Sequence, residues 1–313
     1  MYYSILFFIL ILFQSSIKLR EVLSIGNKPG VEFLEIFDVC TDYEGNIYVS
    51  DKLEYAIKKF DRDGNLINKV GKRGQGPGEF RVGPGQIACA GDIIAVVDFT
   101  TSIIHLFTKD LKFIKAVSTP SAVIDVTSDE NNNIYAVYVN FWGSKLSTEV
   151  AVFSKNGDKI KTIKTGEGFS NAFEGFVTIS SLHDYLVLCY YVLNKVLLLD
   201  RVSGKLIKEF SVDVLPKKSK FKKIEGVEIE VPEENMFLDI ATDSSKERVL
   251  LLGGGYSGNP GRDIYILDKN GKLIQTITLP EKTKFIHLDN EGYLYTSEKD
   301  YTVLKKFKFF GSN

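Results

Sequence analysis

The last repeat of this chain is incomplete, and a segment that would complete it lies at the other end of the sequence. Val303-Leu304-Lys305-Lys306-Phe307 copies Ala56-Ile57-Lys58-Lys59-Phe60. The earlier copy continues into Leu66–Val70, whereas the later one stops at Phe310-Gly311-Ser312. Residues 22–26, Val-Leu-Ser-Ile-Gly, match the missing continuation. Because pairing the two ends would leave no unpaired strand edge, the sequence predicts a closed ring of repeats.

The number of repeats follows from the apolar residue that precedes the second hairpin turn of each. Periods of about 40 to 50 residues, with four short strands each, are typical of β-propeller blades. The marker residues are Phe60, Phe107, Phe153, Leu199, Leu267 and Phe307. The longest spacing between consecutive marker residues, from Leu199 to Leu267, contains an insertion at residues 214–236. We therefore predict one all-β domain over residues 19–313, a six-bladed β-propeller with four antiparallel strands per blade and a last blade closed by the N-terminal strand.

The first blade shows the expected strand pattern. Apolar and polar residues alternate in Phe37–Asp42 and in Ile47–Ser50, on either side of a turn at Tyr43–Asn46. A second hairpin turns at Asp61-Arg62-Asp63-Gly64, where Asp-Gly supplies the positive φ that tight hairpins need. The insertion carries lysines in its first half and glutamates in its second. It predicts either a solvated excursion or a hairpin that serves as a flap or docking element.

An apolar run at residues 5–13 precedes the propeller and has no counterpart in any blade. Its length matches the core of a secretory signal and falls short of a bilayer span. We predict that residues 1–17 are a signal peptide and that the protein is secreted or periplasmic. No Lys or Arg precedes the run and its cleavage site is poor, so an uncleaved membrane anchor and a mis-chosen start or packed strand are the alternatives. Membrane contact is expected only through residues 1–17.

Charge and cysteine content exclude several classes of function. The chain has 39 basic and 40 acidic residues, so no whole-chain field attracts nucleic acid or anionic lipid. Cys40, Cys89 and Cys189 are too few and too far apart in sequence for a disulfide framework or a zinc site. We expect three buried free thiols.

The glycine-rich segment Gly71–Arg81 contains Gly-x-x-Gly-x-Gly-Pro-Gly-x-Phe, and Asp42–Asp51 reads Asp-x-x-Gly-Asn-Ile-Tyr-Val-x-Asp. In these two motifs the chain resembles the NHL-type six-bladed propellers, a group common among bacterial envelope proteins. The resemblance is strong over the first blade and the closure, and weak over the fourth blade. It implies a fold and not a reaction, because the family includes protein-binding, RNA-binding, sensor and lyase members.

The residues do not support catalysis. Lyase members of this group bind zinc through clustered histidines, whereas His105, His183 and His287 fall on different parts of different blades. The Glu-Gly-Pro motif of the gluconolactonase branch and a Gly-x-Ser-x-Gly elbow are both missing from the sequence. We predict no catalytic residue, no metal and no cofactor. The alternative is a lyase- or lactonase-type enzyme with a divalent cation such as calcium in the channel, near Asp51, Asp98 and Asp243.

Antiparallel strands place the interblade loops and the loops between second and third strands on one face, where propeller loops converge on the central channel. Aromatic and basic residues in these loops are the types that dominate binding hot spots. The candidate ligand-binding residues are Tyr55, Arg73, Gln75, Arg81, Trp142, Lys145, Tyr191, Arg262 and Tyr301. For the glycine-rich loop the competing interpretation is a structural turn, and for the aromatic residues it is packing between blades. The sequence thus predicts a non-catalytic binding or sensor propeller that recognises a protein, a carbohydrate or a small ligand.

Overall fold

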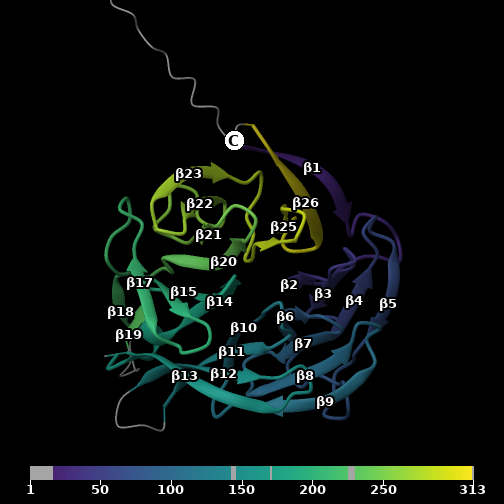
Figure 1. The fold of residues 1–313 in the computed structure, drawn as a ribbon. Coiled ribbons are helices and arrows are strands. Elements are labelled where there is room, and N and C mark those ends of the chain that lie inside the picture. The colour runs from purple at the N-terminus through teal and green to yellow at the C-terminus, as the bar shows by residue number, and fades with distance from the viewer. Residues whose placement is uncertain (1–16, 142–145, 170, 225–229, 312–313) are drawn as a thin grey trace, which may run out of the picture.

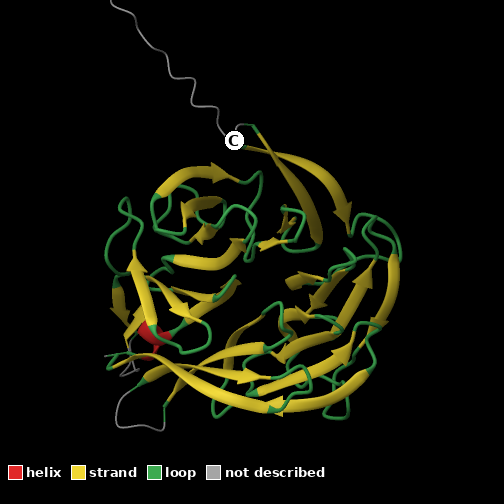
Figure 2. Ribbon diagram, viewed as in Figure 1, coloured by secondary structure: helices red, strands yellow, loops and turns green. Residues whose placement is uncertain are grey.

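Six four-stranded antiparallel sheets surround a central axis in the computed structural model of the chain (Figure 1). The structure describes residues 17–141, 146–169, 171–224 and 230–311. Nearly all of the regular structure is β-strand, and a single short 3-10 helix, η1 (Ala172–Gly175), is found within these ranges (Figure 2). The predicted all-β, six-bladed propeller is therefore confirmed.

The strands run outward from the axis in chain order in each of the first five blades. Blade 1 is β2 (Ile36–Thr41), β3 (Ile47–Asp51), β4 (Ala56–Phe60) and β5 (Leu66–Val70); blade 2 is β6 (Pro84–Ala90), β7 (Ile93–Asp98), β8 (Ile103–Thr108) and β9 (Phe113–Ser118). Blade 3 is β10 (Val123–Ser128), β11 (Ile134–Asn140), β12 (Ser147–Phe153) and β13 (Lys159–Glu167); blade 4 is β14 (Val177–Leu182), β15 (Tyr185–Tyr190), β16 (Val196–Asp200) and β17 (Leu206–Phe210). Blade 5 is β20 (Phe237–Asp243), β21 (Arg248–Gly253), β22 (Asp263–Asp268) and β23 (Leu273–Thr278).

The sixth blade joins the two ends of the chain. It contains β24 (His287–Leu288), β25 (Tyr293–Glu298), β26 (Val303–Phe310) and, outermost, β1 (Lys18–Ile25). β1 pairs with β26 antiparallel, with Ser24 opposite Lys305 and Lys18 opposite Phe310. Lys305 also forms an ion pair with Glu21 across this seam at 2.8 Å. Closure by the N-terminal strand is as predicted, and the strand begins four residues earlier than the sequence repeat indicated.

The insertion between blades 4 and 5 forms a small sheet of its own. β18 (Phe221–Lys223) and β19 (Glu230–Pro232) pair antiparallel, with Phe221 opposite Pro232. The insertion therefore contains a hairpin, while its role as a flap or docking element stays a prediction. Most of the alternating segment 227–231 lies outside the described residues. Among the residues that the structure describes, no helix is long and apolar enough to cross a bilayer.

The Asp-x-x-Gly-Asn-x-Tyr motif of blade 1 holds its own hairpin together. The Asp42 carboxylate accepts hydrogen bonds from the Glu44 and Asn46 backbone N–H groups and from the Tyr48 hydroxyl, the last at 3.0 Å. Asp129 with Tyr135 and Asp289 with Tyr295 repeat this arrangement in blades 3 and 6. Since each carboxylate satisfies turn N–H groups that would otherwise lack partners, the role of the motif is structural.

Apolar side chains are buried between neighbouring blades and not in one central core. One such cluster joins Ala95 and Val97 of blade 2 to Ala136 and Ala151 of blade 3. Another joins Leu250 and Ile264 of blade 5 to Leu294 of blade 6. A ring of separate interfaces lets a chain of this length fold as one domain and leaves the axis free for a channel.

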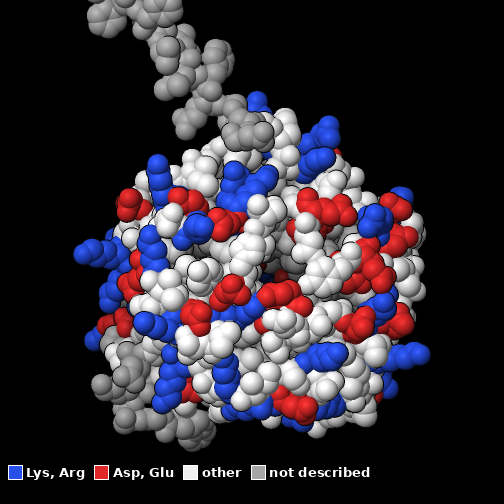
Figure 3. All heavy atoms as spheres, viewed as in Figure 1, with Lys and Arg blue, Asp and Glu red and all other residues white. Residues whose placement is uncertain are grey.

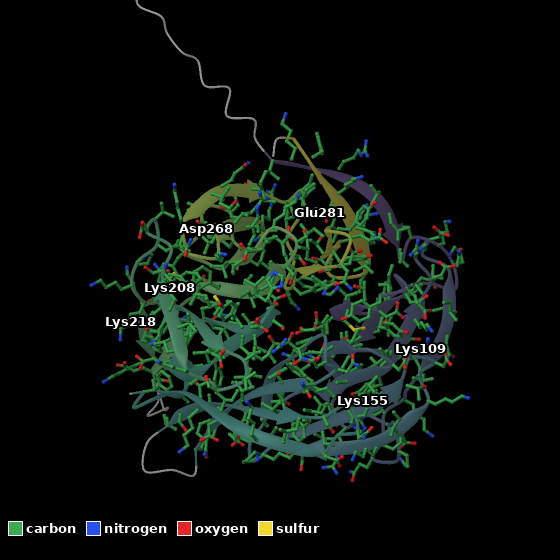
Figure 4. All side chains as sticks on the ribbon, viewed as in Figure 1. Lys109, Lys155, Lys208, Lys218, Asp268 and Glu281 are labelled. Atoms are coloured by element: carbon green, nitrogen blue, oxygen red, sulfur yellow. A yellow bond between two sulfur atoms is a disulfide. The ribbon has the colours of Figure 1, made fainter. Side chains whose placement is uncertain are left out.

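Two of the three cysteines form a disulfide, so the expectation of three free thiols is wrong for them. Cys40 on β2 and Cys89 on β6 are bonded, with their Cα atoms 5.7 Å apart (Figure 4). Their separation of 49 residues is close to one blade period, which is why the two inner strands place them side by side. Cys189 is buried and free, as predicted.

Candidate functional site

The innermost strand of each blade places one residue at the same level of the central channel. The pairing registers identify these positions, because Asp38, Asp125 and Asp239 lie opposite equivalent residues of their second strands. Thr178 occupies the same register in blade 4, and Gln86 and Phe285 precede the equivalent isoleucines of blades 2 and 6. We call these six residues the channel ring: Asp38, Gln86, Asp125, Thr178, Asp239 and Phe285.

The aspartates of the channel ring come from blades 1, 3 and 5, and each connects its blade to the next. Asp125 accepts a hydrogen bond from the N–H of Val126 on its own strand at 2.7 Å and from the N–H of Ile179 on the following blade at 2.8 Å. The same pair of bonds is made by Asp38 to Val39 and Ile87, and by Asp239 to Ile240 and Ile286. A register shift immediately precedes all three aspartates, and such bulges re-aim the side chain.

Thr178 connects two of the three carboxyl groups. Its hydroxyl lies 2.6 Å from Oδ2 of Asp125 and 3.0 Å from Oδ1 of Asp239. A hydroxyl has only one proton to donate, so both contacts are full hydrogen bonds only when one carboxyl is protonated. The geometry therefore favours a ring in which the carboxyl groups are not all ionised.

Burial raises the pKa of all three carboxyl groups, so they lose their protons at a higher pH than aspartates in water. Removal from water, followed by repulsion from Asp125, raises the pKa of Asp239 to about 8. Burial also raises the pKa of Asp125 to about 6, and burial together with repulsion from Asp239 and Asp125 raises the pKa of Asp38 well above its usual value. The phenol of Tyr191 shares this environment, and its pKa is raised by burial and then by the nearby carboxylates. At neutral pH the ring carries less negative charge than three aspartates would in water.

A cavity of about 430 Å³ lies above the channel ring, on the face of the interblade loops. We call it the funnel. Its walls are apolar, and its floor contains the three ring aspartates. The apolar wall residues are Phe37, Phe99, Ile124, Phe176, Leu238 and Phe285. Tyr191, Gln86, Asn235 and Lys284 add a few polar groups.

A second cavity, of about 210 Å³, lies on the opposite side of the ring aspartates. Hydroxyl groups line it, and several of them are engaged with other side chains or with the backbone. Ser180 lies 2.9 Å from Thr242, and the Ser128 hydroxyl donates to the Cys89 carbonyl at 2.6 Å. His287, which contacts Thr41, is kept neutral because burial lowers its pKa to about 4. This cavity has about half the volume of the funnel, and several of its polar groups already have partners, so we regard the funnel as the candidate site.

The structure brings only part of the predicted binding set to the funnel. Tyr191 lines it, and the Tyr301 ring packs against the Lys284 ammonium at its rim, 3.9 Å from the ring centroid. Arg73 stacks on Tyr55 at 5.8 Å, and the Arg262 Nε donates to a backbone carbonyl, so these side chains have local partners. Gln75 and Arg81 are exposed and do not line the funnel. Trp142 and Lys145 lie outside the described residues.

The glycine-rich loop is closed by contacts within itself. Glu79 accepts a hydrogen bond from the Gly76 N–H at 2.9 Å and forms an ion pair with Lys72 at 2.9 Å. Arg73 and Phe80 form a bridge across the loop. These contacts support the structural interpretation of this loop over a ligand cradle.

The carboxylates considered for a channel cation have other roles. Asp51 accepts hydrogen bonds from the N–H groups of Leu34 and Glu35 and forms an ion pair with Lys58 at 2.9 Å. Asp98 similarly accepts hydrogen bonds from three N–H groups of the loop that leads into blade 2. Asp243 ends a first strand, on the opposite face of the ring. In the part of the chain that the structure describes, no three His, Cys, Asp or Glu residues are placed to hold one metal ion.

The channel ring was missed by sequence reasoning, although a signal was present. The triplets Phe37-Asp38-Val39, Ile124-Asp125-Val126 and Leu238-Asp239-Ile240 share one pattern and recur in every second blade. A comparison of alternate blades, in place of neighbouring ones, would have identified the three aspartates. Surface charge gives no comparable signal, since acidic and basic side chains are interspersed over the face in view in Figure 3.

Comparison with known proteins identifies the family and the fold. The model of the family DUF5128, described as "6-bladed beta-propeller", matches residues 13–242. No curated protein matches the chain significantly. Similar solved structures include the RRP9 WD40 repeats (11% identity, TM-score 0.58, 93% of this chain and 97% of that chain) and the WD40 propeller of Doa1 (12%, 0.53, 93% and 97%). Streptogramin B lyase is also similar (10%, 0.57, 95% and 99%). At these identities the likeness shows the fold alone.

Proposed function

Since the chain belongs to the DUF5128 family of six-bladed β-propellers and its fold leaves the activity open, we propose that it is a non-catalytic binding or sensor propeller whose ligand enters the funnel. The observation that carries this proposal is the funnel itself. Small-molecule sites are typically cavities of about 300–1,000 Å³ with apolar walls and a few placed polar groups. A cavity of about 430 Å³ with aromatic walls above three carboxyl groups fits this description. Of the partner classes that the sequence leaves open, which include proteins and carbohydrates, a small ligand suits this volume best.

A lyase- or lactonase-type enzyme is the alternative, and the geometry gives it less support. His105 lies on a third strand, His183 in a hairpin turn and His287 on an inner strand of another blade. Burial lowers the pKa of both His105 and His287, so each is a neutral packed side chain. A histidine-bound metal of the kind used by lyases would need ligands that converge.

The finer family assignment and the location of the protein belong to this proposal. The Asp42 turn motif and the glycine-rich loop support an NHL-type propeller. The apolar run at residues 5–13 supports export, and so does the bond between Cys40 and Cys89, because disulfides persist in oxidising compartments. Fractionation of expressing cells, with thiol labelling of the denatured protein, tests this. One labelled cysteine in the exported fraction is expected, and three labelled cysteines in a cytosolic fraction would contradict export.

A screen of small molecules by ligand-observed NMR tests the binding proposal. Ala122 is exposed and lines the funnel, so Ala122→Trp should fill the cavity with little effect on folding. Val202→Trp is the matched control, because Val202 is 75% exposed in a turn on the opposite face. We expect bound molecules that Ala122→Trp releases and Val202→Trp retains. The proposal would be overturned if the Ala122→Trp variant bound the same molecules as the parent, or if no molecule in the screen bound.

A further inference from the structure

The funnel changes character with depth, and its floor lacks a cationic partner. The walls are aromatic and aliphatic, whereas the floor consists of carboxyl groups. Within the described residues, no lysine or arginine forms an ion pair with Asp38, Asp125 or Asp239. The basic residues nearby are engaged at the mouth, where Lys284 pairs with Glu35 at 3.1 Å and Lys52 lies 4.0 Å from the Phe99 ring centroid.

The floor also offers more hydrogen-bond acceptors than the protein uses. A carboxyl group can accept about four hydrogen bonds when it is ionised, and it keeps acceptor positions when it is protonated. Asp38 accepts two, from the Val39 and Ile87 N–H groups, and it lines the cavities on both sides of the ring. Gln86, a ring neighbour of Asp38, has a carboxamide oxygen that is shielded from solvent and accepts no hydrogen bond from the described residues. A ligand suited to this floor brings N–H donors.

The shape and charge of the floor select one kind of cation. The ring carboxyl groups are not among any group of described residues placed to chelate a metal ion, and the apolar walls offer nothing to a hydrated ion. A primary ammonium group has three N–H donors and a stem that can lie against the aromatic walls. Of the groups that face the ring, Tyr191 and Cys189 are neutral because burial raises the pKa of both. Asp125, with a pKa of about 6, is ionised at neutral pH, whereas Asp239, with a pKa of about 8, is mainly protonated. One positive charge therefore balances the Asp125 carboxylate.

We propose that the funnel binds a small organic monocation, a primary amine on an aromatic or apolar stem, with its ammonium group at the channel ring. This inference rests on the proposed function and names the chemical class of the ligand. The ammonium group contacts Asp125 and the free acceptor positions of Asp38 and Gln86, while the stem replaces water along the funnel walls.

Calorimetric titration of the full chain with three matched probes at neutral pH tests this inference. Phenethylammonium has the proposed chemistry, 2-phenylethanol keeps the stem without the charge, and 3-phenylpropanoate reverses the charge. We expect phenethylammonium to bind with one site per chain and at least about tenfold more tightly than the alcohol. The carboxylate probe should show no binding. Because a bound cation favours ionised carboxyl groups, binding should release protons, so the measured heat should depend on the ionisation enthalpy of the buffer.

Three variants locate the bound cation. Asp125→Asn should weaken phenethylammonium binding by about tenfold or more, and Ala122→Trp should abolish it. Asp300→Asn is the matched control, because Asp300 is an exposed carboxylate in a loop on the same face, and it should leave the affinity unchanged. If Asp125→Asn fails to fold, the contrast among the probes and the proton release of the unmodified protein still decide the question.

The outcomes separate this inference from the proposed function. If 2-phenylethanol binds as tightly as phenethylammonium and Ala122→Trp releases both, the funnel is a binding site without preference for a cation, and the inference alone falls. The same conclusion follows if other screened molecules bind in the funnel and phenethylammonium does not. If Ala122→Trp leaves phenethylammonium binding unchanged, the cation binds elsewhere and the inference is overturned. If no molecule binds in the funnel at all, both proposals are overturned.

Discussion

Blades 1, 3 and 5 differ from blades 2, 4 and 6 at one position of the innermost strand. The first set carries Asp38, Asp125 and Asp239, each of which receives an N–H group from the following blade. The second set carries Gln86, Thr178 and Phe285 at the same level. All six blades share one backbone arrangement. Around the channel, however, the aspartates link them in three pairs, blade 1 with 2, blade 3 with 4 and blade 5 with 6.

This difference shows how a repeat protein can acquire a site without disturbing its repeat. The second and third strands supply apolar side chains that pack neighbouring blades together, as Ala95 and Val97 of β7, Ala151 of β12 and Ile264 of β22 do. Chemistry is confined to one inner position, where a carboxyl group satisfies two backbone donors and still faces the channel. Charged residues such as Lys109, Lys155 and Asp268, by contrast, lie toward the periphery (Figure 4).

The substitution with the largest expected effect tests whether the inner position contributes more to the free energy of unfolding in blades 1, 3 and 5 than in blades 2, 4 and 6. Asp125→Ala leaves the Val126 and Ile179 N–H groups without their partner and removes the shorter of the two hydrogen bonds of the Thr178 hydroxyl. We expect a loss of about 3–4 kcal/mol in the free energy of unfolding, measured by urea denaturation at pH 5. At that pH Asp125 is mainly protonated, so the loss of hydrogen bonds dominates.

Gln86→Ala is the control from the other set of blades. The Gln86 carboxamide oxygen makes no hydrogen bond with the described residues, so its removal should change stability by less than about 1 kcal/mol. If Asp125→Ala and Gln86→Ala reduced the free energy of unfolding equally, the difference between the two sets of blades would make no contribution to stability.

A smaller effect concerns the covalent bond that only one pair of blades possesses. Cys40 and Cys89 join the inner strands of blades 1 and 2. Replacing both by alanine should reduce the free energy of unfolding by about 3 kcal/mol, because the unfolded chain gains freedom when a long loop is opened. Urea denaturation measures the loss, and Cys189→Ala serves as a control for the removal of a buried thiol. If the double variant is as stable as the parent, the carboxyl bridge at Asp38 alone secures this pair.

The smallest expected effect is a pH dependence that belongs to the aspartate-bearing blades. The folded-state pKa values of Asp125, about 6, and Asp239, about 8, lie above the usual value of 3.8. Their contribution to stability is therefore complete below about pH 4 and is lost as the pH rises through 6 and then 8. Between pH 7 and pH 9 the parent should lose about 1 kcal/mol more than Asp239→Asn, which cannot titrate. Parallel stability curves for parent and Asp239→Asn in urea would contradict this, and Asp300→Asn should follow the parent.

Much of the fold was predictable because it depends on local patterns that repeat. The alternation of strands, the Asp-Gly turns and the match between residues 22–26 and the truncated last repeat are all visible in the sequence, and they determine blade number and closure. Tyr191 lines the funnel and Tyr301 packs against Lys284 at its rim, while the predicted role of both in ligand binding stays a prediction.

The site was less predictable because it depends on contacts between blades. The bond between Cys40 and Cys89, and the N–H group that Ile179 offers to Asp125, arise from neighbouring inner strands that share no sequence proximity. Arg73 and Arg262 are of a residue type that is common in binding sites, but the Arg73 side chain stacks on Tyr55 and the Arg262 side chain donates to a backbone carbonyl. The tertiary structure decides whether a loop side chain points into a cavity or packs on its own loop. The residue type alone does not predict this.

The pairing of β1 with β26 also has a consequence for the order of events during synthesis. The first strand of the propeller finds its partner in the last strand of the propeller. Blades 1 to 5 can each assemble as their residues appear, but the residues around Leu23 must wait, unpaired, until β26 of the sixth blade has been synthesised. Ring completion is thus a late, long-range step, and a nascent chain held at that stage would present a ready docking edge to chaperones or to another unfinished copy of itself.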